Sequence, residues 1–134
     1  MPISTATYLL IGTGSADETA TGASVANNAT QTGSVVDLLG DDTSTGDVEL
    51  YLILTSTVTA GSVQLRFNPH RRSNSGAEEY VKVSYEISVV PTNGTQKIPL
   101  GTRRCPRYMS CDVLNNATGA SATVVILAKV TKLS

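Results

Sequence analysis

The sequence predicts a single all-β domain over residues 1–134, an antiparallel β-sandwich of jelly-roll type, and three observations support this. Thr and Ser supply 32 of the 134 residues and Val supplies 14, and β-branched side chains favour strands over helices. Several segments alternate apolar and polar residues with a period of two, which is typical of strands with one buried face. Turn signals separate these segments and none has the spacing of an amphipathic helix, so jelly roll and Greek key are the leading topologies.

Seven or eight strands are expected in chain order, over the ranges Thr5–Ile11, Val35–Leu39, Asp47–Thr55, Ser62–Asn68, Tyr80–Val90, Gln96–Leu100, Arg107–Leu114 and Thr123–Leu133. The dipeptide Asn93-Gly94 is a favoured hairpin turn because both residues tolerate positive φ. We therefore expect Gln96–Leu100 to return as the partner of Tyr80–Val90, and the last two strands to form another pair joined by residues 115–121. Pro99 cannot donate to a ladder, which predicts a sheet edge or a strand end.

Residues 12–34 read GTGSADETATGASVANNATQTGS and show no apolar periodicity. We expect an extended N-terminal arm or a long loop there, because packed elements need a repeating apolar face. A loop of this length is unusual inside a compact domain, which favours contacts with another molecule. A segment without fixed contacts is the alternative.

Charge is distributed unevenly along the chain. Residues 1–65 hold seven acidic residues and no Lys or Arg, while residues 66–134 hold all ten basic residues and four acidic ones. Residues 1–10 lack the basic start and long apolar run of a signal peptide, and no segment has the ~20 apolar residues that span a bilayer. We therefore expect a protein that is made in the cytoplasm and does not enter a membrane.

The residues offer little for catalysis, cofactors or metals. A zinc site needs four close ligands, and the chain has two cysteines and one histidine. Cys111 shares its strand face with Met109 and Val113, so we expect buried free thiols at Cys105 and Cys111, with a disulfide as the alternative. Asp41, Asp42 and Asp47 have turn chemistry, with calcium as the alternative. We expect no enzyme, no cofactor and no metal.

Two basic clusters carry half of the Lys and Arg residues of the chain, and they provide the candidate site residues His70, Arg71, Arg72, Arg103, Arg104 and Arg107. Their guanidinium groups are able to bind carboxylates or phosphates in a bidentate manner. Three interpretations stay open: solvated loop charge, contact with a protein partner, and contact with nucleic acid. The pI of about 5.7 argues against nucleic acid as the partner, and so does the presence of only one nearby stacking ring, that of Tyr108.

The succession SVVDLLG, GDVELYLILTSTVTAGSVQLRF and IPLGTRRCPRYMSCDVLNNATG, followed by an apolar strand, resembles the small cement or decoration proteins of tailed-bacteriophage capsids. The resemblance covers roughly residues 33–133 and lies in the order of elements and turn residues, and residues 12–34 have no counterpart in it. It implies a jelly-roll or β-sandwich domain on the capsid exterior. It also implies binding to the major capsid protein as a homodimer or homotrimer, without catalysis.

The sequence thus predicts a structural virion protein that binds the outer surface of a phage capsid. We expect the 12–34 segment and the two basic clusters to make the contacts. Two alternatives come from other classes: a carbohydrate-binding or adhesin-like module, and a small viral coat protein that contacts nucleic acid. A sugar platform usually presents an exposed Trp or Tyr, and this chain has no Trp. Salt-dependent binding to RNA or DNA would identify the coat protein.

Overall fold

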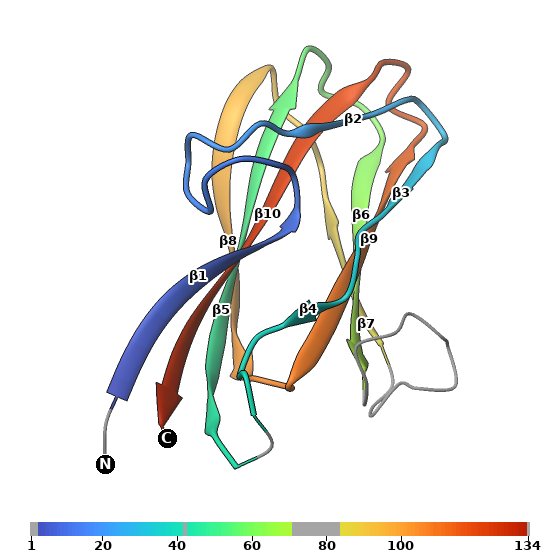
Figure 1. Ribbon diagram of the computed structural model, residues 1–134. Coiled ribbons are helices and arrows are strands. Elements are labelled where there is room, and N and C mark those ends of the chain that lie inside the picture. The colour runs from blue at the N-terminus through green and yellow to red at the C-terminus, as the bar shows by residue number, and fades with distance from the viewer. Residues whose placement is uncertain (1–2, 42, 71–83, 134) are drawn as a thin grey trace.

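The protein is an all-β sandwich of two antiparallel sheets that pack face to face (Figure 1). The computed structural model describes residues 3–41, 43–70 and 84–133. In the first sheet the strand order is β1-β10-β5-β8, and β2 also pairs with β10. The strands of this sheet are β1 (Ile3–Ile11), β2 (Ala23–Val25), β5 (Thr45–Ser56), β8 (Gly94–Arg104) and β10 (Ala122–Leu133).

The second sheet has the order β3-β9-β6-β7, and β4 pairs with β9 beyond the end of β3. Its strands are β3 (Thr30–Thr32), β4 (Val36–Asp37), β6 (Ser62–His70), β7 (Tyr85–Val89) and β9 (Tyr108–Asn116). If β3 and β4 are counted as one interrupted strand, the main strands divide four and four between the sheets. Their order is that of a jelly roll, which confirms the fold class that the sequence predicts.

The two predicted hairpins are wrong. β7 pairs with β6 and β8 pairs with β5, so the connection through Asn93-Gly94 crosses from one sheet to the other. The same holds for β9, which pairs with β6, and β10, which pairs with β5. Gly94 does adopt a positive φ of 109°, but a turn residue reverses the chain without deciding which sheet the next strand joins. Pro99 lies on β8, an edge strand, as expected.

The core lies between the sheets and contains the side chains that the alternation places on one face of each strand. Val63, Leu65 and Phe67 of β6 have no exposed surface, and the face of β10 that points toward the second sheet is also buried. The inward residues of β10 are Val124, Ile126, Ala128 and Val130. Phe67 is the largest fully buried side chain, and its truncation to Ala is expected to cost about 3–5 kcal/mol of unfolding free energy.

Residues 12–34 fold back onto the sandwich instead of extending from it as an arm, so they are a long loop with two short strands, β2 and β3. Residues 12–22 cross the outer face of the first sheet (Figure 1). Glu18 there forms an ion pair with Lys97 of β8, and the segment shields Leu127, which is 4% exposed although it faces outward. Residues 12–34 are therefore the long loop of the two alternatives, and their role in contacts with another molecule stays a prediction.

Candidate functional site

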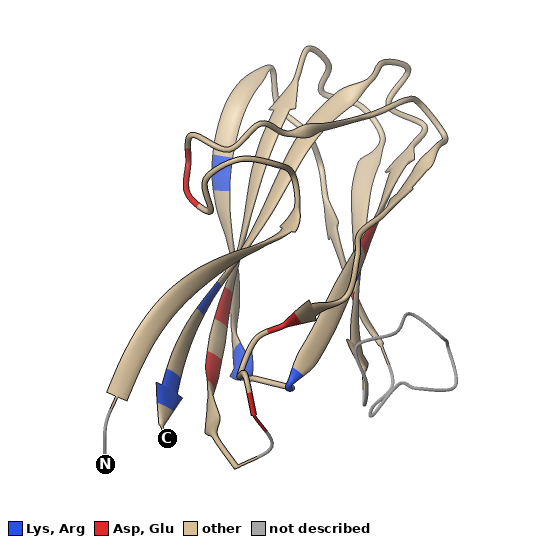
Figure 2. Ribbon diagram, viewed as in Figure 1, with Lys and Arg blue, Asp and Glu red and all other residues tan. Residues whose placement is uncertain are grey.

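Four basic residues of the described chain, Arg103, Arg104, Arg107 and Lys132, lie at one end of the sandwich, which we call the charged end. Arg66 and Lys97 lie elsewhere, midway along β6 and near the start of β8. The charged end carries the loop residues 38–41 and 43–44 and the linker 105–107, and the last residues of β8 lie beside them (Figure 2). The predicted site residues Arg103, Arg104 and Arg107 all lie here, and their environments differ. Arg71 and Arg72 lie outside the described residues.

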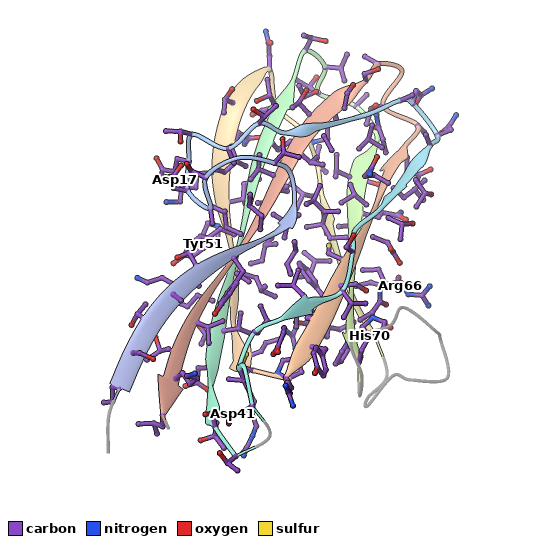
Figure 3. All side chains as sticks on the ribbon, viewed as in Figure 1. Asp17, Asp41, Tyr51, Arg66 and His70 are labelled. Carbon is purple, nitrogen blue, oxygen red and sulfur yellow. The ribbon has the colours of Figure 1, made fainter. Side chains whose placement is uncertain are left out.

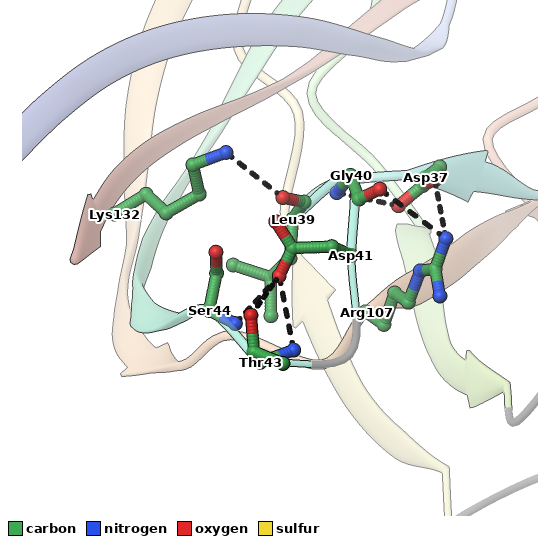
Figure 4. A network of polar contacts seen from close by, with 8 residues as sticks. All are labelled: Asp37, Leu39, Gly40, Asp41, Thr43, Ser44, Arg107 and Lys132. Carbon is green, nitrogen blue, oxygen red and sulfur yellow. Dashed lines mark hydrogen bonds and ion pairs between the residues drawn. The ribbon is translucent and has the colours of Figure 1, made fainter. Parts of the chain in front are cut away.

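Arg107 is an internal clamp. Its Nη2 lies 3.4 Å from Oδ2 of Asp37 and donates a hydrogen bond of 3.3 Å to the carbonyl oxygen of Gly40 (Figure 4). The two paired side chains are 27% and 37% exposed. Arg107 thus ties the linker between β8 and β9 to the loop after β4, and these contacts engage the guanidinium group within the chain.

Lys132 and Asp41 also hold the loop residues 38–41 and 43–44 in place. Nζ of Lys132 on β10 donates to the carbonyl oxygen of Leu39 at 3.0 Å. The Asp41 carboxylate accepts hydrogen bonds from Ser44 N and from both the backbone and the hydroxyl of Thr43 (Figure 4). These bonds, those of Ser44 above all, lower the pKa of Asp41 from 3.8 to about 2. Asp41 is a turn former, as one of the two interpretations held.

Arg103 on β8 of the first sheet stacks on an aromatic pair that lies on two neighbouring strands of the second sheet. Its Cζ lies 3.7 Å from the ring centroid of Tyr85 on β7, and Tyr85 in turn stacks on Phe67 with 5.3 Å between centroids. Desolvation raises the pKa of Tyr85 to about 12. The Tyr85 hydroxyl is buried and has no hydrogen-bond partner among the described residues. The guanidinium group therefore closes this side of the core with a cation–π contact.

Arg104 is the arginine most open to a partner. It is exposed, and in the described part of the chain no acidic group lies within ion-pair distance of it. It lines a shallow hollow on the outer face of the first sheet, together with Asp47 and two exposed apolar side chains, Ile3 and Leu133. An exposed arginine beside apolar surface is typical of protein–protein interfaces, in which Arg and apolar groups are enriched.

His70 is not a surface residue, which corrects its assignment to a basic loop. It is the last residue of β6, it is 1% exposed, and its Nε2 lies 2.8 Å from the Ser110 hydroxyl (Figure 3). Burial lowers the pKa of His70, against a smaller opposing effect of Asp112. The histidine belongs to the packed interior of the charged end and is not accessible to a partner.

The two cysteines are buried free thiols, as expected. Cys111 is fully buried on β9 between the inward-facing Met109 and Val113, and Cys105 is 7% exposed. Burial raises the pKa of Cys105 to about 12 and that of Cys111 further. Both thiols therefore stay protonated at neutral pH, and the thiolate is the nucleophilic form.

The opposite end of the sandwich, which we call the uncharged end, was not singled out from the sequence. Its loops are residues 26–29, 57–61, 90–93 and 117–121, and none of them contains a charged residue. Figure 2 shows these loops without a coloured segment. Val90 there is 64% exposed. Each loop is ordinary on its own, and the shared absence of charge becomes visible only when the fold brings the four together.

The buried side chain of Asn115 holds the loops of the uncharged end together through hydrogen bonds. It is fully buried, and its side-chain amide donates to the carbonyl oxygens of Val25 at 2.9 Å and Ala120 at 2.7 Å. Its Oδ1 accepts a hydrogen bond from the Thr118 hydroxyl. Asn28, at a positive φ of 62°, caps the backbone N–H of Ala117 at 2.9 Å. The tetrapeptide NNAT occurs twice in the sequence, at residues 27–30 and 115–118. The two segments lie side by side and form hydrogen bonds with each other.

Over residues 3–41, 43–70 and 84–133 there is no helix of the length and apolarity needed to cross a membrane. The same residues contain no group of three or more His, Cys, Asp or Glu side chains placed to hold a metal ion. Comparison of the chain with protein-family models, curated proteins and solved structures gives no match.

Proposed function

We propose that the protein is a structural component of a virus particle, a decoration domain that binds the outer surface of a phage capsid by contacting the major capsid protein. The observation that carries this proposal is the hollow at the charged end, where Arg104 lies beside exposed Ile3 and Leu133. Its mixture of a guanidinium group and apolar side chains suits a protein surface that offers a carboxylate next to an apolar patch.

The fold supports this proposal at the level of analogy. Jelly rolls occur in viral capsid proteins, lectins and cupins, and function lies in the site more than in the fold. The resemblance of residues 33–133 to capsid decoration proteins favours the first of these groups. A domain that binds only the assembled shell would stabilise it by mass action, without any chemical step.

The proposal is tested on virus particles purified from the native source of the protein. Immunogold electron microscopy with an antibody against the purified protein is expected to label the exterior of intact particles. A protein that is absent from purified particles, or that is labelled only after the shell is broken, would contradict the proposal. Binding of the purified protein to glycans without particles would favour a lectin-like module instead.

The site is tested with a pair of matched variants. Arg104→Gln removes the guanidinium group of the hollow, and Lys129→Gln removes one charge from the same outer face, outside the hollow. Affinity for particles that lack the protein is expected to fall about tenfold or more in the first variant and to change little in the second. Equal affinity of both variants would exclude the hollow as the contact surface.

A further inference from the structure

The four sheet edges of the sandwich differ in how they are protected. Edge strands expose unpaired backbone groups that attract other chains, and proteins usually guard them with charge, proline, bulges or short length. β8 carries Lys97, Pro99 and a register shift after Leu50 of its neighbour β5. β7 has five residues, and Pro91 follows soon after it, while β3 and β4 have three and two residues.

β1 has none of these guards along most of its length. It runs for nine residues, contains neither a charged residue nor a proline, and its only register shift lies at the far end, between Leu9 and Ile11. One side of the strand pairs with β10. Within the described part of the chain, the backbone of residues 3–9 forms no hydrogen bond beyond that ladder. In Figure 1, β1 is the outermost strand of its sheet and curves away from the rest of the sandwich at its start.

We infer that β1 pairs with β1 of a second copy of the chain, antiparallel and around a two-fold axis at Ala6. In this register residue i faces residue 12 − i of the other copy, and the sequence of β1 matches itself. Ile3 faces Leu9, Ser4 faces Tyr8, and Thr5 faces Thr7. Ile3 thus meets the apolar Leu9 and Thr meets Thr, which are favourable cross-strand pairs.

The geometry of the sheet favours this register over the two symmetric registers next to it. Residues of equal parity lie on the same face of a strand, so a symmetric pairing joins residues whose numbers add to an even sum. If the numbers of paired residues add to 10, Tyr8 and Leu9 face residues 2 and 1, which lie outside the described residues. If they add to 14, Ile3 faces Ile11, which lies beyond the register shift of β1. Pairing around Ala6 also brings Ile3, which is 68% exposed, next to Leu9 of the second copy. A two-fold interface of this kind closes on itself and yields a dimer.

The inference does not rest on the proposed function, since it concerns the isolated protein, and its test requires no particles. Analytical ultracentrifugation is expected to show a dimer in concentration-dependent equilibrium with the monomer. The double variant Thr5→Lys, Thr7→Lys places Lys opposite Lys at two positions and is expected to weaken the dimer at least about tenfold. Its matched control, Thr5→Lys, Thr7→Glu, places Lys opposite Glu and is expected to keep the dimer.

A cross-link tests the axis directly. Residues opposite each other in an antiparallel pair have Cα atoms about 4.5–5.5 Å apart, which suits a disulfide. Ala6→Cys is therefore expected to form a disulfide-linked dimer under mild oxidation, whereas Thr102→Cys on the opposite edge strand stays monomeric. The native thiols do not interfere, because both are buried.

Three results would overturn the inference: a wild-type chain that is monomeric at every attainable concentration, a dimer that tolerates the Lys–Lys variant, or a Lys–Glu variant as disrupted as the Lys–Lys one. If the wild-type chain is a monomer but Ala6→Cys cross-links to a capsid protein, another partner occupies β1 and the second copy is excluded. Hydrogen exchange of the wild-type protein provides a readout without variants, since the β1 amides are expected to become more protected as the concentration rises.

Discussion

The two ends of this sandwich are held together by different physical means. At the uncharged end, the fully buried Asn115 side chain binds two carbonyl oxygens and the Thr118 hydroxyl. At the charged end, the Arg107–Asp37 pair and Lys132 hold a loop through contacts that solvent reaches. A buried hydrogen bond is costly to break because its partner is left unsatisfied, whereas an exposed ion pair is replaced by water and salt at little cost. The end without charge is therefore expected to be the more stable.

The largest effect is expected from Asn115→Ala at the uncharged end. The variant removes the donor of the buried Val25 carbonyl oxygen, one of the two donors of the Ala120 carbonyl oxygen and the acceptor of the Thr118 hydroxyl. Together these losses are expected to lower the unfolding free energy by about 2–4 kcal/mol. Urea unfolding measures the loss. The neighbour Asn116 makes no side-chain hydrogen bond within the described residues, so Asn116→Ala is expected to stay within about 0.5 kcal/mol of wild type. Equal losses in both variants would refute the role of the buried amide.

An intermediate effect is expected where the charged end meets the core. Arg103→Ala removes the cation that covers Tyr85, and about 1 kcal/mol of unfolding free energy should be lost. Because the chain has no Trp, near-ultraviolet circular dichroism reports on its tyrosines and should change in this variant. Arg104→Ala, one residue further on, is the control and is expected to leave both readouts unchanged. A change of similar size in the control would indicate a general charge effect.

A smaller effect, and one that depends on salt, is expected from the clamp at Arg107. Arg107→Ala should cost about 0.5–1 kcal/mol at low ionic strength. The loss is expected to shrink at high salt, because screening weakens a pair that is partly exposed. The cost of Asn115→Ala should not change with salt, so the two variants measured together separate the two ends. A loss at Arg107 that is independent of salt would mean that packing dominates there.

The smallest effect is expected from protonation of the Asp41 carboxylate at low pH. Since its pKa is lower in the folded protein than the ordinary 3.8, its contribution to stability is complete above pH 3.8 and is lost as the pH falls through about 2. The amide signals of Thr43 and Ser44 in NMR spectra should shift with a midpoint near pH 2. Asp41→Asn removes this titration. A midpoint at or above 3.8 would show that these hydrogen bonds do not form in solution.

Local features of the chain were predictable from the sequence because they depend on neighbouring residues. The period of two in Ser62–Asn68 places Val63, Leu65 and Phe67 on one face, and all three are buried. The same reasoning gives the buried free thiol at Cys111 and the edge position of Pro99. Arg103, Arg104 and Arg107 do lie at one end of the molecule. Of the expected strand over residues 80–90, positions 80–83 lie outside the described residues, and β7 begins at Tyr85.

By itself, then, the sequence determined the all-β class, the strands and their inward faces, because alternation along a strand is a local property of the backbone. Only the tertiary structure decided which strands pair, since a turn such as Asn93-Gly94 reverses the chain without selecting a sheet. Tertiary packing also buried His70, engaged Arg107 with Asp37 and laid residues 12–22 over Leu127. Each of these outcomes depends on residues far apart in the chain, and the free energy of contacts between distant residues leaves no periodic signal in the sequence.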